Sequence, residues 1–496
     1  MNEIELKLSL RPGQIARLRR HPLLAAGRPV SRRLYSIYLD TPERDLQRRG
    51  ITLRVRRAGR RWLQTLKAEA ISVGALTQRA EWEMPLPGGS HDLSRFPPQA
   101  LDLLQGLDMS RIGPVFVTDF RRTAWVVHLR ETVMEVALDR GEIRADGQGV
   151  PLAELEIELR SGPPRALFDL ALTLLAHVPM GVEPRSKAAR GYALAGVFVP
   201  GPVQAMVPVL DQALTAGQAW PLLAGVGLAQ MVGNVPGFLG RPQDIGYLHQ
   251  LRVGLRRLRG VADLAKDLGA VTPAWDRDLK ALMSTLNAAR DWDVFLQETL
   301  PRLSTRLGAP ALPPALHRHC ARMADTARRR AQGAVADGAF TRLVLEIGRD
   351  LLEVREDAAP LEVWAAACLE TRWRALRKRG RDFAGLDGAR RHRLRIAAKR
   401  LRYIADVLRP VFEKTQASTD DFLDKLGRLQ NRLGAERDRV MAAQLLEGMR
   451  HAAPAIRFDA GRLAGLLATR KSDGKAEKAW AAWMRARPCW RLRTRR

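Results

Sequence analysis

The sequence predicts an α+β chain of two domains that differ in class: an antiparallel β-barrel over roughly the first 200 residues, and an all-α region after it. Short segments of alternating polarity recur up to residue 159, and longer 3.6-residue periods rich in Ala, Leu and Arg follow from about residue 207. Residues 199–203 hold two prolines and a glycine, which continue neither kind of element. We place the domains at 1–198 and 207–490, with a linker at 199–206 and a basic tail at 491–496.

The composition indicates a folded protein with a polyanionic partner. The 496 residues are 46% hydrophobic and carry 82 Lys and Arg against 53 Asp and Glu, a net charge of +29. Residues 1–200 carry 30 basic and 22 acidic residues, a net of +8, and the remaining 296 residues a net of +21. Such a chain favours nucleic acid, a phosphate polymer or an acidic membrane, and its helical half is the stronger candidate for that contact.

Cysteine usage and the apolar segments bear on the cellular location. Cys320, Cys368 and Cys489 lie far apart, which excludes a disulfide framework and fits a reducing cytosol. The first residues lack the order of a signal peptide. Residues 221–240 contain Gln230 and Asn234, so we expect a helix and turn there, not a membrane span. We therefore expect a cytoplasmic protein with no membrane partner.

The elements of the first domain follow from period-two alternation and from the turn residues between segments. The expected strands are 4–10, 34–40, 52–57, 61–67, 78–86, 123–130, 132–139 and 155–159. The expected helices are 12–20, 99–104 and 164–175.

Charged side chains share one face on several of these strands. Glu3, Glu5 and Lys7 alternate with apolar residues and so point to one side. One such strand is typical of an ordinary half-solvated sheet, but the pattern recurs. It is repeated at Arg54 and Arg56, at Arg79, Glu81 and Glu83, at Glu135 and Asp139, and at Glu154, Glu156 and Glu158; Lys67 ends a further strand. If these faces converge, the sheet closes into a barrel with a polar lumen and outward apolar faces covered by helices.

Crowded carboxylates and cations in one lumen need compensation, because like charges repel or shift one another's pKa. Divalent cations would neutralise the acids, and a phosphate chain would neutralise the bases. Hard oxygen ligands favour Mg²⁺ or Mn²⁺. The residues therefore predict a phosphate-chain site with a divalent metal.

The segment 3–7 (EIELK) resembles the ExExK signature of the CYTH family, the triphosphate tunnel metalloenzymes. The resemblance continues in order over about 195 residues. It runs through 38–42 (YLDTP), 53–56 (LRVR), 64–67 (QTLK), 79–81 (RAE), 120–122 (FRR), 135–139 (EVALD), 154–158 (ELEIE) and 186–187 (SK). It implies an eight-stranded tunnel barrel with flanking helices that acts on a triphosphate.

The resemblance also implies roles for residues of the tunnel. Metal ligands would be Glu3, Glu5, Asp139, Glu154 and Glu156. Catalytic roles, including orientation of the attacking water, would fall to Glu3, Glu5, Lys7, Glu156 and Glu158. Phosphate oxygens would be clamped by Lys7, Arg54, Arg56, Lys67, Arg79, Arg122 and Lys187. The division between metal ligand and general base among the glutamates stays open. Arg122 is favoured over Arg121, and Asp40 is expected to be a turn residue.

The second half contains an internal repeat. Residues 249–259 (HQLRVGLRRLR) resemble 392–402 (HRLRIAAKRLR) with the same offsets. In each copy one His and three cations fall within an arc of about 80° on a helix, and the apolar residues lie on a separate arc. The stripes are His249, Arg252, Arg256 and Arg259, and His392, Arg395, Lys399 and Arg402. One copy alone would be typical of a solvated helix face, but two copies favour two basic surfaces that face one anion.

This repeat resembles the CHAD family, over roughly 207–490 with copies at about 240–300 and 385–445. The resemblance implies a pair of pseudo-symmetric four-helix bundles that bind inorganic polyphosphate in a central basic groove. Arg290 and Arg437 occupy matching downstream positions, where they contact phosphate or pair with the adjacent Asp291 and Asp438.

The two resemblances together predict a metal-dependent inorganic triphosphatase that cleaves tripolyphosphate to pyrophosphate and phosphate, with Mg²⁺ or Mn²⁺ as cofactor and inorganic polyphosphate as a partner. The alternatives are a CYTH-type adenylate cyclase, a thiamine triphosphatase, or a non-catalytic polyphosphate-binding scaffold. Nucleic acid is disfavoured because no nucleic-acid-binding signature accompanies the basic stripes. The expected location is cytoplasmic, with polyphosphate granules as a site of association.

Overall fold

The computed structural model describes residues 2–68, 71–73, 76–196, 201–206, 208, 210–211, 213–269, 272–306, 313–353, 359–468 and 474–491. They form two compact units, which we describe separately. The first unit comprises Met1–Gln204, Leu228–Arg241 and Val335–Glu353, and the second comprises Ala205–Gly227, Pro242–Ala334 and Val354–Arg496. The units do not follow chain order, and the domain boundaries expected from the sequence stay a prediction. Parts of the expected linker (199–200) and tail (492–496) lie outside the described residues.

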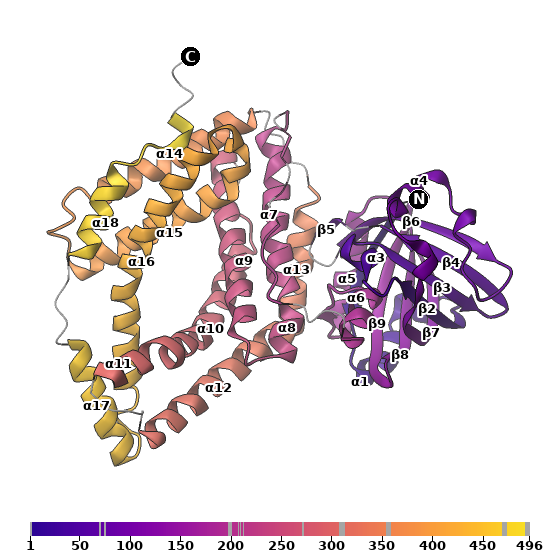
Figure 1. Cartoon of the computed structure of the whole chain (residues 1–496), viewed down its shortest axis with the longest axis horizontal. Coiled ribbons are helices and arrows are strands. Elements are labelled where there is room, and N and C mark those ends of the chain that lie inside the picture. The colour runs from indigo at the N-terminus through magenta and orange to yellow at the C-terminus, as the bar shows by residue number, and fades with distance from the viewer. Residues whose placement is uncertain are drawn as a thin grey trace. The chain divides into compact units, whose positions relative to one another are not determined.

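The first unit is built on a closed antiparallel barrel of eight described strands (Figure 1). Their order is β1-β9-β8-β7-β2-β3-β4-β6, and pairing of β1 with β6 closes the ring. The strands are β1 (Asn2–Ser9), β2 (Val30–Asp40), β3 (Thr52–Ala58), β4 (Arg61–Lys67), β6 (Leu76–Leu86), β7 (Gly113–Leu129), β8 (Thr132–Ala145) and β9 (Gln148–Ser161). Two short strands, β5 (Ile71–Val73) and β10 (Gly181–Val182), pair with β6 and β1. The predicted fold class is confirmed.

The strands β7, β8 and β9 are longer than the alternation predicted. The expected segments 132–139 and 155–159 are parts of strands of 14 residues each, and the expected segment 123–130 lies in a strand of 17 residues except for its last residue. The missed part of β8, Arg140–Ala145, continues the alternation, with charged residues at 140, 142 and 144, but it contains a glycine, which is depleted in strands. It is hydrogen-bonded to β7 and β9 on both sides. Pairing with both neighbours offsets the weak strand propensity of this segment.

The outward apolar faces of the barrel strands pack beneath helices. Leu155 and Ile157 on β9 are fully buried, and α5 (Arg165–His177) buries its own apolar face on the same side. The other helices of the N-terminal segment are α1 (Pro12–Arg19), α2 (Pro22–Ala25), α3 (Asp45–Arg48), α4 (Pro98–Leu101) and α6 (Lys187–Leu194), with short 3₁₀ turns at Leu93–Arg95, Asp102–Leu104 and Met109–Arg111.

A helix from the second half of the chain completes this unit. The helix α13 (Gly338–Asp350) packs on α5, and its Gly348 faces the ring of Phe168. A Cβ atom at position 348 would lie 2.5 Å from that ring, so the close approach requires glycine. Arg349 Nη1 also donates to Asp169 Oδ1 at 3.1 Å. The barrel's outer core therefore depends on residues far along the sequence.

The remaining described chain is almost entirely helical, as predicted. The helices are α7 (Ala216–Gly233), α8 (Val235–Gly240), α9 (Ile245–Leu264), α10 (Asp276–Val294), α11 (Leu300–Arg306), α12 (Pro314–Ala336), α14 (Leu361–Arg379), α15 (Gly388–Leu408), α16 (Gln416–Glu447), α17 (Pro454–Ala468) and α18 (Lys475–Met484), with 3₁₀ or π turns at Ala265–Leu268, Phe295–Thr299, Arg409–Thr415 and Cys489–Arg491. In the second unit, α9 packs on α15 and α10, and α15 packs on α14 and α16.

One helical stretch, Ala216–Gly240, is long and apolar enough to cross a membrane by length and composition alone. Its most apolar window is 61% buried within the protein, as in a core helix, and Asn234 separates α7 from α8. The expected helix and turn are found at this place.

Candidate functional site

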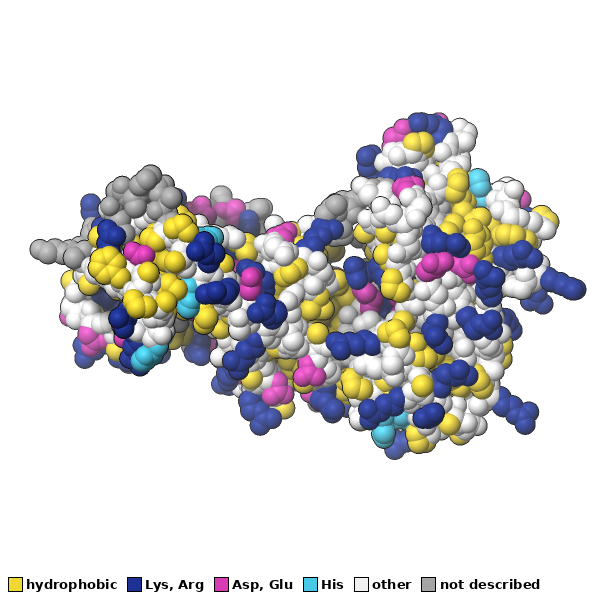
Figure 2. All heavy atoms as spheres, turned by 90° about the horizontal axis from the view of Figure 1, so that it is seen from below, with side chains coloured by type: hydrophobic (Ala, Val, Ile, Leu, Met, Phe, Trp, Pro, Cys, Tyr) yellow, Lys and Arg dark blue, Asp and Glu magenta, His cyan; other side chains and the backbone are white. Residues whose placement is uncertain are grey.

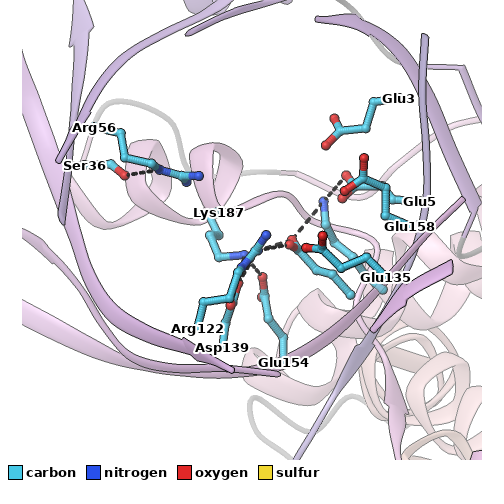
Figure 3. A network of polar contacts seen from close by, with 12 residues as sticks. Glu3, Glu5, Ser36, Arg56, Arg122, Glu135, Asp139, Glu154, Glu158 and Lys187 are labelled. Atoms are coloured by element: carbon cyan, nitrogen blue, oxygen red, sulfur yellow. Dashed lines mark hydrogen bonds and ion pairs between the residues drawn. The ribbon is translucent and has the colours of Figure 1, made fainter. Parts of the chain in front are cut away.

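The barrel encloses charged side chains that come from all around its wall (Figure 3). The strand positions predicted to share a face do point inward. The free volume is only about 50 Å³, room for a few waters. The space is small because the cationic side chains lie across it, most of them against a carboxylate.

The first cluster surrounds the two glutamates of β1. Lys7 Nζ lies 2.7 Å from Glu5 Oε1, and Arg79 donates to Glu3 at 2.8 Å and to Glu5 at 2.7 Å. Lys67 Nζ donates to Glu3 Oε2, also at 2.8 Å. Burial by itself would raise the pKa of Glu3, but Lys67 and Arg79 hold that pKa well below its usual range. Glu3 is therefore ionised at neutral pH and available to a cation.

The second cluster brings together Asp139 of β8 with Glu154 and Glu156 of β9. Lys187 Nζ contacts all three carboxylates, at 2.7 Å from Asp139 and 2.8 Å from Glu156. Arg122 donates two hydrogen bonds to Asp139, at 2.8 and 2.7 Å, and one to Glu156. Lys187 is buried, which would lower its pKa, but the three acids raise that pKa well above its usual value. These contacts place Arg122 inward, as favoured, and Arg121 is exposed.

A hydroxyl-lined wall holds the remaining arginines, and the sequence reasoning had not assigned its residues to the site. Arg56 Nε donates to Ser36 Oγ at 2.9 Å, and Arg54 Nε donates to Thr65 Oγ1 at 3.2 Å. Tyr38 also lines the cavity. Ser36 and Tyr38 alternate along β2, so the period-two pattern was the available signal. Hydroxyl side chains on a strand are too common to stand out in a sequence.

An aromatic floor supports three of the cations. Lys187 Nζ lies 5.1 Å from the ring centroid of Phe120, and the guanidinium carbons of Arg56 and Arg122 lie at 5.9 and 6.0 Å. Phe120 clusters with Leu34 and Leu152. Cations over an aromatic face gain some electrostatic stabilisation from the ring, and this contact uses none of their N–H donors.

A third acidic pair, Glu135 and Glu158, is held by Arg160 on the same strand face. Arg160 donates to each of them at 2.7 Å. Burial raises the pKa of Glu158 to about 7, against the lowering effect of Arg160. Glu158 can thus exchange a proton near neutral pH.

The residues of the second cluster fit a divalent cation. Ligand atoms of Asp139, Glu154 and Glu156 lie within 4.8 Å of one another, and all three residues are buried or half-buried. Glu154 Oε1 is buried and lies against Lys187 Nζ. An all-carboxylate oxygen set suits a hard cation such as Mg²⁺ or Mn²⁺. The predicted ligands Glu3 and Glu5 lie in the neighbouring cluster.

Asp40 does not belong to the lumen. Its carboxylate accepts hydrogen bonds from the backbone N–H groups of Leu46 and Gln47 at 2.9 and 3.1 Å, and from the Tyr192 hydroxyl at 2.8 Å. It ties the start of α3 to α6, which agrees with the expected structural role.

The helical half contains a separate hollow of about 520 Å³, which we call the central groove. It brings α9 and α15 together through Arg252, Arg256, Arg259, His392, Arg395 and Lys399. Buried donors without a hydrogen-bond partner among the described residues include Arg252 Nε and Arg256 Nε. Figure 2 shows many Lys and Arg side chains on one face of the molecule, with fewer Asp and Glu. Buried N–H groups without acceptors are costly unless a ligand supplies the acceptor.

The two copies of the repeat are not equivalent. His392 lines the central groove and is exposed, whereas His249 is half-buried and does not line it. Burial, then Arg290, Arg256 and Arg252, lower the pKa of His249 to about 4, so it is neutral at pH 7. Arg290 Nη1 is a further buried donor without a partner in the described chain. Arg402 instead faces Gln430, at 3.4 Å, and the side chain of Arg437 lies outside the described residues.

Burial and mutual repulsion also lower the pKa of other cations of the groove. Burial, followed by Arg395, Arg256 and Arg252, lowers the pKa of Lys399 to about 7. Burial and Arg256 lower the pKa of Arg252 to about 10. These shifts indicate positive charges crowded together without enough acid nearby.

Comparison with protein families identifies both halves. Residues 1–192 match the CYTH domain model, and residues 224–447 match the CHAD domain model.

Two known proteins resemble the two halves in turn. An inorganic triphosphatase of Haemophilus influenzae is 33% identical over 202 residues, 39% of this chain and 55% of the relative, so the match spans about half of the relative's length. The crystal structure of the CHAD domain from the plant Ricinus communis aligns with 58% of this chain and 98% of its own, at 29% identity and a TM-score of 0.51.

Proposed function

Because residues 1–192 are a CYTH domain and residues 224–447 are a CHAD domain, we propose that the chain is a metal-dependent triphosphatase. It hydrolyses inorganic tripolyphosphate to pyrophosphate and phosphate, and its helical half binds inorganic polyphosphate. The observation that carries the proposal is the paired charge of the barrel lumen, where seven predicted phosphate-binding cations converge on a cavity of about 50 Å³. The similarity of part of this chain to an inorganic triphosphatase supports the proposed type of reaction.

Substrate binding works by exchange of partners. Lys7, Lys67, Arg79, Arg122 and Lys187 are each held by carboxylates in the free protein. A triphosphate offers these cations oxygens of higher charge, and the released carboxylates would then be free to hold a metal. Spread positive charge on the phosphate oxygens is what phosphoryl transfer requires.

When bound, Mg²⁺ or Mn²⁺ would neutralise negative charge on the phosphates and lower the pKa of water. Asp139, Glu154 and Glu156 would hold it, with Glu3 and Glu5 as neighbouring ligands. The oxygen of a water molecule attacks the terminal phosphorus, the bridging P–O bond breaks, and pyrophosphate leaves. Glu158, with its pKa of about 7, takes up the proton that the water loses.

The central groove would bind the longer phosphate chain. Its cations repel one another and leave buried donors unsatisfied, so a bound polyanion relieves both costs. We propose that the protein is cytoplasmic and associates with polyphosphate granules, because these granules contain the polymer that the groove would bind.

A substrate panel tests the activity. The full chain is incubated with tripolyphosphate, ATP or thiamine triphosphate in the presence of Mg²⁺ or Mn²⁺, and phosphate, cyclic AMP and thiamine diphosphate are measured. We expect tripolyphosphate to give the highest kcat/KM. Cyclic AMP as the main product from ATP, or no turnover of any of the three, would contradict the proposal.

A salt titration tests the second half of the proposal. Affinities for long-chain polyphosphate and for duplex DNA are measured at rising salt with the full chain. We expect polyphosphate to remain bound at salt that releases DNA. Equal affinities at physiological salt would mean that counterion release alone accounts for the binding.

A further inference from the structure

A second hollow opens beside the central groove, and we call it the side pocket. Its volume is about 340 Å³, within the range of small-molecule sites. Its walls come from the end of α9 with the 3₁₀ turn after it, from α14 and from α15. It shares Asp263, Ile396 and Arg400 with the central groove, but its other lining residues are its own.

The pocket carries arginines that form no ion pair among the described residues. Arg393 and Arg400 are exposed, and neither has an acidic partner within the described chain. They are seven residues apart on α15, two turns, and so lie on one face about 10 Å apart. Arg379 of α14 lines the pocket too, and its Nη1 donates only to the carbonyl of Ala375. This set of arginines suits two or three phosphate groups.

Between these arginines the surface is apolar. Ile396 is 39% exposed there, on a helix face otherwise rich in arginine. Ala375 and Ala397 line the pocket with minimal side chains, which leaves room for a flat group. An inorganic phosphate chain gains nothing from an apolar wall, because all its outer atoms are charged or strongly polar. An aromatic ring gains both the apolar contact and stacking with guanidinium groups.

Two acidic residues of the pocket wall also favour a nucleotide over an inorganic phosphate chain. Asp263 and Asp267 each accept a hydrogen bond from Arg372 Nη2 through Oδ2, at 3.3 and 2.7 Å. Both carboxylates line the pocket. A purely anionic chain is repelled by two carboxylates, whereas a heterocyclic base with N–H groups can donate to them.

We propose that the side pocket binds a nucleoside phosphate. The phosphates lie on Arg379, Arg393 and Arg400, and the base lies against Ile396 and the alanines with its N–H groups toward the acidic wall. The site is separate from the tunnel and does not depend on its activity. Because Arg400 also lines the central groove, an occupied side pocket weakens polyphosphate binding there.

The test is calorimetric titration of the full chain with ADP in the presence of EDTA, so that no metal-dependent turnover occurs. We expect ADP binding to fall at least tenfold in Arg393→Ser, an exposed substitution that leaves the fold intact, and in Ala397→Phe, which fills the pocket. Lys378→Ser is the matched control: it removes one exposed cation of α14 beside Arg379 but outside the pocket, and ADP binding should not change.

Inorganic tripolyphosphate serves as the competing probe. In a competition assay with labelled ADP, we expect tripolyphosphate to displace the label at least tenfold more weakly than unlabelled ADP does. Equal displacement would show that the pocket merely continues the phosphate-chain groove. Absence of ADP binding at millimolar concentration, or ADP binding unchanged in both pocket variants, would equally overturn the proposal. Neither result would bear on tripolyphosphate hydrolysis, which the substrate panel tests on its own.

Discussion

The barrel lumen and the central groove are both rich in cations, yet they treat charge in opposite ways. In the lumen Lys187 contacts three carboxylates, and Arg79 and Lys67 each contact two. In the groove, burial and then neighbouring arginines lower the pKa of Arg252 and of Lys399, and Arg252 and Arg256 each carry a buried Nε without a hydrogen-bond partner among the described residues. Paired charges can exchange partners for a metal and its phosphates, which suits catalysis. Positive charges that lack acidic partners are stabilised when an anion binds, which suits a site that holds a polyanion.

The strongest test of this difference is Glu5→Gln in the lumen. The amide cannot neutralise Lys7 and Arg79 or serve as an anionic ligand, so we expect tripolyphosphate turnover to fall about 10³-fold, or roughly 4 kcal/mol. Polyphosphate binding by the helical half should not change. The matched control is Glu142→Gln on the same barrel, a solvent-exposed acid of β8 that pairs with Arg144. Loss of polyphosphate binding in Glu5→Gln would show that the two sites are one.

Stability should respond with opposite signs in the two regions. In Lys187→Met, three buried carboxylates lose their shared cation, and we expect the free energy of unfolding to fall by about 3–5 kcal/mol without divalent metal. In Lys399→Met, a buried cation among like charges is removed, and we expect a rise on the order of 1 kcal/mol. Equilibrium denaturation in urea measures both. The same sign in both variants would refute the contrast between paired and unpaired charge.

A smaller effect tests where the barrel unit ends. Gly348→Val on α13 would place side-chain atoms against the ring of Phe168, and we expect a loss of about 1–3 kcal/mol of stability from overpacking. Gly333→Val on α12 is the control, since nothing lies within 4 Å of a Cβ atom there. The loss of tripolyphosphatase activity with rising urea concentration reports on unfolding of the barrel itself. Equal losses in both variants would mean that helix propensity, and not this contact, sets the effect.

The smallest expected effect is the pH dependence of polyphosphate binding. In the free groove the pKa of Lys399 is lowered to about 7, by burial and then by Arg395. A bound phosphate chain favours the charged form, so binding takes up a proton above pH 7 and affinity falls as pH rises, at most tenfold per unit. We expect the Kd for polyphosphate to be threefold to tenfold higher at pH 8.5 than at pH 6.5, at constant ionic strength. Lys399→Arg should remove this pH dependence. If the pH dependence of Kd were unchanged in Lys399→Arg, another group would be its source.

Period-two alternation was enough to predict which charges of each strand face the same way. It placed Glu3, Glu5 and Lys7 together, and the structure brings them into the lumen as expected. Alternation could not supply Lys187, which lies at the first turn of α6 after the N-cap Ser186 and reaches the lumen from a helix. Only the resemblance to a family pointed to it. Ser36 and Phe120 carried no signal distinct from that of any strand residue.

The repeat in the helical half was visible in the sequence, but its two copies differ in the structure. Equal spacing predicted equal roles for His249 and His392. In the structure His249 is half-buried among arginines, whereas His392 is exposed in the groove. Spacing on a helix fixes the face a residue occupies but not what packs against that face.

The sequence by itself determined the order of elements, the polar face of each strand, the basic stripes of the two repeat helices and the excess of positive charge, because these depend on local periodicity and composition. Tertiary structure alone decided which cation meets which carboxylate, how little room the lumen leaves, and which basic residues remain without a partner. Those outcomes depend on contacts between residues far apart along the chain, such as Arg122 with Glu156 and Gly348 with Phe168. No local pattern encodes the distance between two such atoms.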